Sequence, residues 1–246
     1  MILIHCAVLA LIAITSFISG IFGVAGGLIL MGGLVYVLPV QQAMVMHGLA
    51  QFVSNASRAV IWRKYVALAL LAKFTATSAL TLLVFWFVLF VPSKPVVLFV
   101  LGLSTTLLFF VPDRWAPSIT QPGLAYLTGA MGTALILVAG VSGPFLDQFF
   151  VRSGLDRRVT IATKAAMQCV SHVAKVIYFG ALAGSFLEPQ WWGLAGLAPL
   201  AAILGASLAS SVLERMTDKQ FYWWTRRIVL VLGIYYLVEA SRAWLV

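Results

Sequence analysis

Residues 20–27 read GIFGVAGG, and these four glycines lie within a segment, Met1 to Ser57, that contains no Asp, Glu, Lys or Arg. The apolar block around them, residues 3–38, is too long for one membrane crossing and too short for two, because a crossing takes about 20 residues. Glycine weakens a helix interior by about 1 kcal/mol relative to alanine, so the cluster predicts an interrupted helix. At membrane depth, such backbone must line protein or a water-filled cavity. The alternative is that the glycines only allow close helix packing.

The whole chain has the composition of a membrane protein. Of its 246 residues, 62% are hydrophobic and 9% are charged, which excludes an ordinary soluble domain. We therefore expect one all-α integral membrane domain, residues 1–246, in the lipid bilayer. Its apolar blocks are residues 3–38, 42–62, 66–91, 95–111, 122–151, 159–182, 191–213 and 221–245.

Charge and cysteine content exclude several other classes of protein. The net charge of +9 is interpreted as cytoplasmic loop charge rather than as a nucleic-acid site. Cys6 and Cys169 lie in separate apolar blocks and without metal-ligand spacing, so we predict no disulfide framework, no metal and no other cofactor.

The sequence aligns with itself at a shift of 117 residues. FGVAGG at residues 22–27 falls on AGVSGP at residues 139–144, and QFVSNASR at 51–58 falls on QCVSHVAK at 168–175. The identities lie at glycine and polar positions, whereas chance similarity between apolar segments would match Leu, Val and Ala. This pattern indicates an internal duplication, which is common in secondary transporters.

The duplication divides the chain into residues 1–111 and 122–246, joined by a proline-containing loop over 112–121. If the glycine block of each half is a re-entrant hairpin, each half crosses the membrane three times more, and the two halves are inverted. The positive-inside rule favours this topology, because it places ten loop cations on one side and only Lys94 and Arg242 on the other. Plain crossings give eight against four. We therefore predict two inverted repeats, each a glycine-broken re-entrant helical hairpin plus three transmembrane helices, with both termini on the non-cytoplasmic side.

Polar residues form a stripe along one helical face of each half. At 100° per residue, one face of the first half presents His47, Gln51, Ser54, Asn55 and Arg58. The corresponding residues of the second half are Lys164, Gln168, Ser171, His172 and Lys175. Polar groups inside the membrane are costly unless they face protein or water, which makes them functional candidates. The alternative is that the two glutamines join helices and that Arg58 and Lys175 reach the headgroups.

These groups favour a small anion as the ligand. They supply amide, hydroxyl and cationic donors, and half-helices that start near Gly26 and Gly143 would add backbone N–H groups. The candidate substrate-binding residues are Gly23, Val24, Ala25, Gly26, Gly27, Gln51, Ser54, Asn55, Arg58, Gly140, Val141, Ser142, Gly143, Pro144, Gln168, Ser171, His172 and Lys175.

Asp147 and His172 break the symmetry between the halves, and either is a candidate for carrying a coupling proton. For Asp147 the alternative is a plain ion pair with Arg152 or Lys164. The candidates for coupling or gating are His47, Asp147 and Lys164.

Several motifs together resemble the TauE/SafE sulfite exporter family, also called TSUP. They are GIFGVAGGLILMGGL, HGLAQFVSNASRAVIWRKYV, GVSGPFLDQFF, ATKAAMQCVSHVAKVIYFG and LGASLASSVLERMTDKQF. The resemblance implies a bacterial inner-membrane permease for sulfite, thiosulfate or an organosulfonate such as sulfoacetate. Its motif residues fall on Gly23, Gly26, Gly27, Asn55, Arg58, Gly143, Pro144 and Lys175. His172 stands where the family often has Asn.

The leading hypothesis is a secondary transporter that moves its anion by alternating access. A passive anion channel is the near alternative, and a membrane-embedded enzyme or assembly factor is a third. An enzyme is disfavoured because the chain has seven acidic residues and no paired carboxylates, HExxH motif or Ser/Lys dyad. Further candidate partners are a coupled proton or sodium ion and a second copy of the chain.

Overall fold

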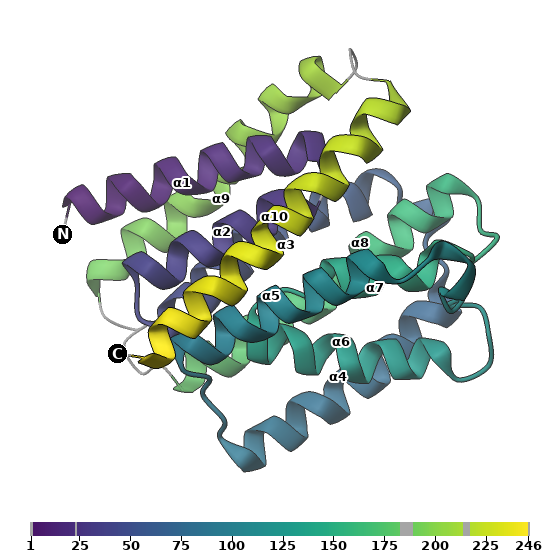
Figure 1. The fold of residues 1–246 in the computed structure, drawn as a ribbon, viewed down its shortest axis with the longest axis horizontal. Coiled ribbons are helices and arrows are strands. Elements are labelled where there is room, and N and C mark those ends of the chain that lie inside the picture. The colour runs from purple at the N-terminus through teal and green to yellow at the C-terminus, as the bar shows by residue number, and fades with distance from the viewer. Residues whose placement is uncertain (1, 23, 183–188, 214–216, 246) are drawn as a thin grey trace.

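Figure 1 shows a computed structural model of the chain, which describes residues 2–22, 24–182, 189–213 and 217–245. Within these ranges every regular element is a helix. The first half contains α1 (Ile2–Phe22), α2 (Val24–Val37), α3 (Val40–Ile61), α4 (Leu68–Val88) and α5 (Lys94–Phe110). The second half contains α6 (Leu124–Ala139), α7 (Gly143–Phe150), α8 (Arg157–Leu182), α9 (Pro189–Leu213) and α10 (Asp218–Leu245).

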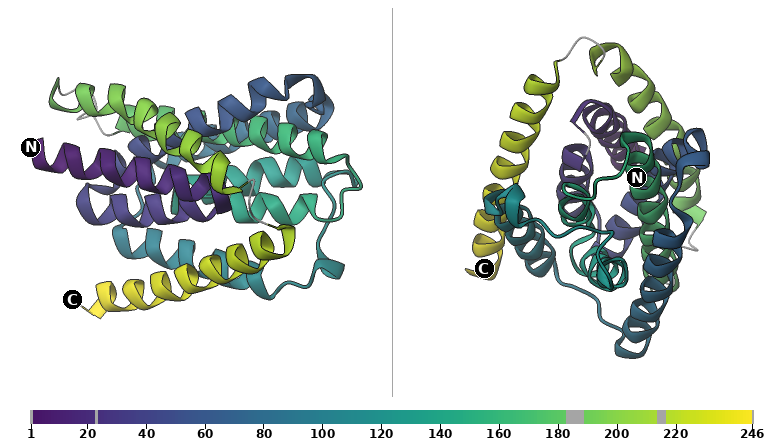
Figure 2. Two further views of the ribbon diagram at one scale, coloured as in Figure 1. Left: turned by 90° about the horizontal axis from the view of Figure 1, so that it is seen from above. Right: turned by 90° about the vertical axis from the view of Figure 1, so that its right-hand side faces the viewer.

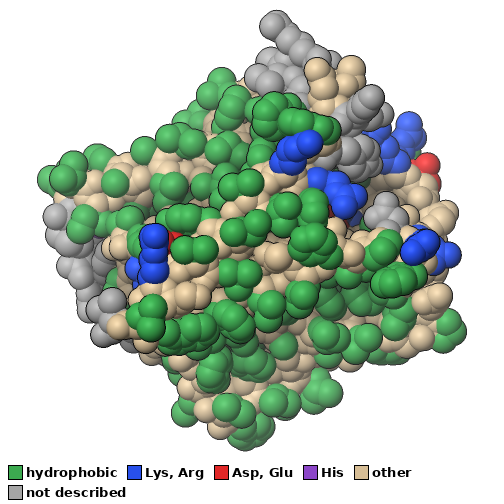
Figure 3. All heavy atoms as spheres, viewed as in Figure 1, with side chains coloured by type: hydrophobic (Ala, Val, Ile, Leu, Met, Phe, Trp, Pro, Cys, Tyr) green, Lys and Arg blue, Asp and Glu red, His purple; other side chains and the backbone are tan. Residues whose placement is uncertain are grey.

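The chain is a multi-pass membrane protein. Five of the described helices are long and apolar enough to cross a bilayer, namely α1, α4, α8, α9 and α10. The apolar helices α2, α5 and α6 are shorter. Most helices run along the long axis of the molecule (Figure 1), and hydrophobic side chains are spread over the whole outer face seen in Figure 3. The predicted all-α membrane class is therefore confirmed.

Each glycine cluster lies where one helix ends and the next begins. Helix α1 ends at Phe22 and α2 starts at Val24, and α2 returns along α1, because Gly26 lies against Thr15 and Ser19. A Cβ atom on Gly26 would overlap the carbonyl oxygen of Thr15, so this close approach requires glycine.

In the second half, α6 ends at Ala139 and α7 starts at Gly143. Gly140 between them has φ 78°, a left-handed conformation that favours glycine. The re-entrant depth of the two helix pairs stays a prediction.

The helices of the two halves pack in exchangeable pairs. Helix α1 packs on α9 as α4 packs on α6, and α3 packs on α9 as α4 packs on α8. Helices α3 and α8 pack on each other, as do α5 and α10. When every helix is replaced by its counterpart in the other half, the first four contacts exchange in pairs and the contacts of α3 with α8 and of α5 with α10 map onto themselves.

Both chain ends lie at the same end of the bundle, here called the terminal end (Figures 1 and 2). Lys94 and Arg242 lie at this end as well. The Lys94 Nζ atom is 3.7 Å from the centre of the Tyr36 ring, and the Tyr36 hydroxyl donates to Glu239. Arg242 completes the group through an ion pair with Glu239.

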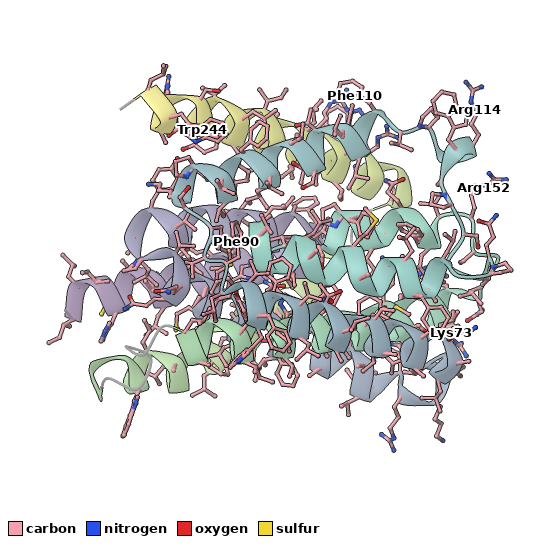
Figure 4. All side chains as sticks on the ribbon, turned by 90° about the horizontal axis from the view of Figure 1, so that it is seen from below. Lys73, Phe90, Phe110, Arg114, Arg152 and Trp244 are labelled. Carbon is pink, nitrogen blue, oxygen red and sulfur yellow. The ribbon has the colours of Figure 1, made fainter. Side chains whose placement is uncertain are left out.

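Most other described loop cations lie at the opposite end, here called the cationic end. Arg114, Arg152 and Lys73 mark this end in Figure 4, far from Trp244. Arg152 donates to the carbonyl oxygen of Arg114 at 2.6 Å, which joins two loops there. The described loop cations are thus divided unequally between the two ends of the bundle, whereas Arg215 lies outside the described residues and the hairpin topology stays a prediction.

The largest apolar core fills the bundle between the helix interruptions and the terminal end. It includes the α2 residues Leu28, Leu30, Met31 and Leu34, and it extends through the first turns of α3 and the last turns of α8. Dense packing of this kind excludes water, so the described residues close the terminal side of the interruptions.

Candidate functional site

Helices α3 and α8 pack side by side in opposite directions. Gly48, near the start of α3, lies against Lys175 and Val176, near the end of α8. At the other end, Arg158 of α8 donates to the hydroxyl of Tyr65, which follows α3, at 3.1 Å. The two polar stripes therefore run past each other in reverse order.

A cavity of about 440 Å³ lies between these stripes and the interruption after α1. Among the described residues, its wall contains four cationic side chains and a single carboxylate, so this part of the wall carries an excess of positive charge that favours anions. Polar amides and hydroxyls make up much of the remaining wall. The lining residues are Ser19, Phe22, Val24, Gln51, Asn55, Arg58, Asp147, Arg157, Thr160, Ile161, Lys164, Ala165, Gln168, Thr225 and Arg226.

The first stripe contributes three of its predicted residues to this wall. Asn55 donates through Nδ2 to the carbonyl oxygen of Gln51 at 2.8 Å, and its Oδ1 accepts from Arg58 Nη2 at 3.1 Å. Asn55 therefore holds the guanidinium of Arg58 in place at the cavity. Ser54 does not line the cavity, and its carbonyl oxygen accepts from Arg58 Nε at 3.3 Å.

The single carboxylate of the cavity belongs to Asp147 on α7. It forms an ion pair with Lys164 on α8, and both side chains are about one-third exposed. Of the two partners considered from the sequence, Lys164 is the one observed, because Arg152 donates to the loop carbonyl of Arg114 instead. The ion pair neutralises one of the four cations of the wall.

The interruptions of the two halves meet beside the cavity. A Cβ atom on Gly143 would lie 3.0 Å from Cγ1 of Val24 and 3.1 Å from Nε2 of Gln168. In the first half, the side-chain amide of Gln51 lies against Gly27 in the same way. Each glutamine therefore packs on the interruption of its own half.

Most other residues of the interruptions are buried behind the cavity wall and do not line the cavity. The buried ones are Ala25, Gly26, Gly27, Gly140, Val141, Ser142 and Gly143. Pro144 lines an adjoining cavity of about 430 Å³ that lies between α5, α7 and α10 and shares Val24, Asp147, Thr225 and Arg226 with the first. Gly23, also a predicted binding residue, lies outside the described residues.

Four predicted residues lie buried on the terminal side of the cavity and do not line it: His47, Ser171, His172 and Lys175. Lys175 has no exposed surface, so the alternative that it reaches the headgroups is wrong. Its Nζ donates to the carbonyl oxygen of Gly140 at 2.8 Å and to Nδ1 of His47 at 2.7 Å.

His47 continues this chain of contacts to the first interruption. Its Nε2 lies 2.9 Å from the carbonyl oxygen of Gly27, which can only accept. Nε2 therefore carries the proton, and Nδ1 accepts from Lys175. One line of hydrogen bonds thus runs from Gly27 through His47 and Lys175 to Gly140, and it connects the two interruptions.

Sequence reasoning missed part of the cavity wall. Arg157 and Thr160 continue the stripe of Lys164 toward the start of α8, at helical spacings of seven and four residues, so the signal was present. Arg226 comes from α10, and nothing in the local sequence connects it to α3 or α8. Among the described residues no group of His, Cys, Asp and Glu side chains could hold a metal.

A family model described as Sulfite exporter TauE/SafE matches residues 8–236 of the chain. This span includes both glycine clusters, both polar stripes and every residue of the cavity wall. No curated protein and no solved structure matches the chain.

Proposed function

The chain belongs to the sulfite exporter TauE/SafE family of membrane permeases, and we propose that it is a secondary transporter for a small sulfur-containing anion. The observation that carries this proposal is the cavity between α3 and α8, with four cationic side chains against one carboxylate. Sulfite, thiosulfate and organosulfonates such as sulfoacetate present several oxygen acceptors on one anionic group. Guanidinium and amide donors bind such groups well.

The proposed binding position is the inner part of the cavity, where Gln51, Gln168 and Arg58 come together. The two glutamines pack on the glycine interruptions, so they supply donors next to backbone that is not in a helix. Lys164 would gain a second anionic partner there besides Asp147.

The exchangeable packing of the two halves supports the inverted-repeat arrangement. Helices α3 and α8 are counterparts and pack antiparallel, as expected for halves related by an axis in the membrane plane. The cavity reaches Arg157 and Arg226 at the cationic end, whereas the apolar core closes the terminal end. A site accessible from one side only is one conformation of an alternating-access cycle and supports a transporter over a passive channel.

The positive-inside rule places the cationic end in the cytoplasm of a bacterial inner membrane. The cavity then faces the cytoplasm, and both termini lie on the other side. Membership in a transporter family favours transport over catalysis for this chain.

The test is flux in proteoliposomes loaded with labelled sulfite, thiosulfate or sulfoacetate. Gln51→Ala and Gln168→Ala should each lower saturable flux by on the order of tenfold, because each removes a donor to the anion. Gln41→Ala at the start of α3 removes the same group away from the cavity wall and should leave flux unchanged.

Two outcomes would count against the proposal. The absence of saturable flux for all three anions would remove the assigned substrate class. Flux that ignores imposed proton and sodium gradients and does not saturate would indicate a passive channel.

A further inference from the structure

The 117-residue shift between the halves relates two pairs of residues. The residues of one pair are in contact, whereas those of its counterpart are apart. It places His47 on Lys164 and Arg58 on Lys175. The pair His47–Lys175 therefore has Lys164–Arg58 as its counterpart. The first pair is closed, with 2.7 Å between Nδ1 and Nζ, and lies on the terminal side. The second pair lines the open cavity on the cationic side.

The same shift relates the present partners of the two cations. Arg58 donates to Asn55, three residues before it on α3. The counterpart of Asn55 is His172, three residues before Lys175 on α8. Nδ1 of His172 is buried without a hydrogen-bond partner in the part of the chain that the structure describes. In the tautomer that carries its proton on Nε2, this nitrogen can accept a hydrogen bond from Lys175 if Lys175 leaves His47.

The chemistry of the two pairs differs in one respect. His47 is neutral and offers an acceptor, so Lys175 can close on it directly. Arg58 and Lys164 are both donors and both cations, so they cannot close on each other without a negative group between them. Asp147 lies at this place, paired with Lys164 in the wall that Arg58 also lines. The counterpart of Asp147 in the first half is Leu30, a buried apolar residue. No negative group is needed there, because His47 and Lys175 contact each other directly.

We propose that these residues form two gates that close alternately. The terminal gate, His47 with Lys175, is closed in this structure and opens when Lys175 moves to His172. The cationic gate, Arg58 and Lys164 joined by Asp147, closes in the other conformation. Asp147 is thus a positioning residue that permits the second closure, and the inference rests on the proposed transport function.

A buried reporter cysteine tests this proposal in purified protein in detergent. Met44 has no exposed surface and lies about one helical turn from His47 toward the terminal end, on the striped face of α3. Met44→Cys in a Cys6→Ser, Cys169→Ser background should react with a polar maleimide only while the terminal gate is open. The labelling rate, measured without any sulfur anion, then reports the open fraction.

Three substitutions should change this rate in stated directions. Lys175→Met removes the closed contact and should raise the rate by on the order of tenfold. Asp147→Asn leaves two cations facing each other in the alternate conformation and should lower the rate by on the order of tenfold. His172→Leu removes the second acceptor for Lys175 and should lower it as well, whereas His172→Asn should restore it.

Matched variants separate gating from loss of fold. Asp156→Asn changes an acid at the start of α8 outside the cavity wall and should label at the parent rate. Asp147→Glu keeps the charge and should label faster than Asp147→Asn. If the Asp147→Asn protein elutes as a single folded species and its labelling rate equals or exceeds the parent rate, the gate assignment is wrong. Because no anion is present, this result is independent of whether the chain transports sulfite.

Discussion

Val24 at the start of α2 lies directly against Gly143 at the start of α7, so the interruptions of the two halves share one surface. Gln168 contacts the same glycine, which places a proposed substrate donor within reach of any side chain added there. Interior packing at this density tolerates little extra volume. The identity of residue 143 should therefore control the geometry of the cavity.

Gly143→Val should lower flux by on the order of tenfold or more, because its branched side chain would displace Val24 and the amide of Gln168. Gly143→Ala should have a smaller effect, since its Cβ would need shifts of only a few tenths of an ångström. Gly180→Val is the control, because a Cβ there meets nothing within 4 Å. Equal flux in the parent and Gly143→Val proteins would contradict the assigned site.

Gly140 should be more sensitive to alanine than another glycine of the same backbone conformation. Gly140→Ala would put an alanine into a left-handed backbone conformation, which costs about 1–2 kcal/mol of stability. The added Cβ would also overlap the side chain of Met31. Gly123→Ala takes nearly the same φ, 80°, in open space, so it reports the backbone cost alone. Thermal unfolding in detergent should show a clearly larger loss of stability for Gly140→Ala. Equal losses would mean that Met31 is free to move aside.

The buried His47–Lys175 pair predicts an order of stability between two substitutions. Lys175→Met keeps the packing and leaves two neutral acceptors unpaired, which costs about 1–3 kcal/mol for each group that stays dry. His47→Leu leaves the carbonyl oxygen of Gly27 without its donor and leaves the buried amine of Lys175 with one acceptor fewer, and a buried amine that lacks an acceptor costs more than a neutral acceptor when the amine is charged. We expect His47→Leu to unfold at the lower temperature. The reverse order would mean that the imidazole contributes packing rather than hydrogen bonding.

Arg58 should be required for anion affinity. Arg58→Gln should weaken anion binding by on the order of tenfold or more, and Arg58→Lys should recover part of it, because lysine keeps the charge without the planar fork. Lys73→Gln removes a cation that lies outside the cavity, 5.9 Å from the centre of the Tyr126 ring, and should leave affinity unchanged. The measurement is competition of each anion in the flux assay. A similar loss in Lys73→Gln would indicate a general effect of net charge.

The order of the helices and the places where they are interrupted could be predicted because their causes are local. Apolar length defines the blocks, and the glycines of the first cluster mark the end of α1 as those of the second mark the end of α6. The unequal lengths of α2 and α7, 14 and 8 residues, have no such local signal. They follow from the contacts of each segment with other helices, as do the pairings of α1 with α9 and of α4 with α6.

The sequence predicted which helical faces carry the candidate site, but not how deeply each residue is buried. Helical spacing places Gln51 and Arg58 on one face of α3, and both line the cavity. It also places Gln168 and Lys175 on one face of α8, of which Gln168 lines the cavity. It could not show that Arg58 borders a cavity while its counterpart Lys175 is fully buried, because that difference arises from which end of the bundle is closed. Residues that align between the two halves of the sequence therefore occupy different environments in this structure.

The distribution of cations predicts which end of the bundle faces the cytoplasm. Ser93 precedes α5 at the terminal end beside Lys94, and Gln121 lies in the loop before α6 at the cationic end; both residues are exposed. In a Cys6→Ser, Cys169→Ser background, Ser93→Cys should react with an impermeant maleimide on intact cells, whereas Gln121→Cys should react only after permeabilisation. Labelling of both cysteines after permeabilisation controls for their reactivity. Reaction of Gln121→Cys on intact cells would reverse the orientation and would make the cavity face outward.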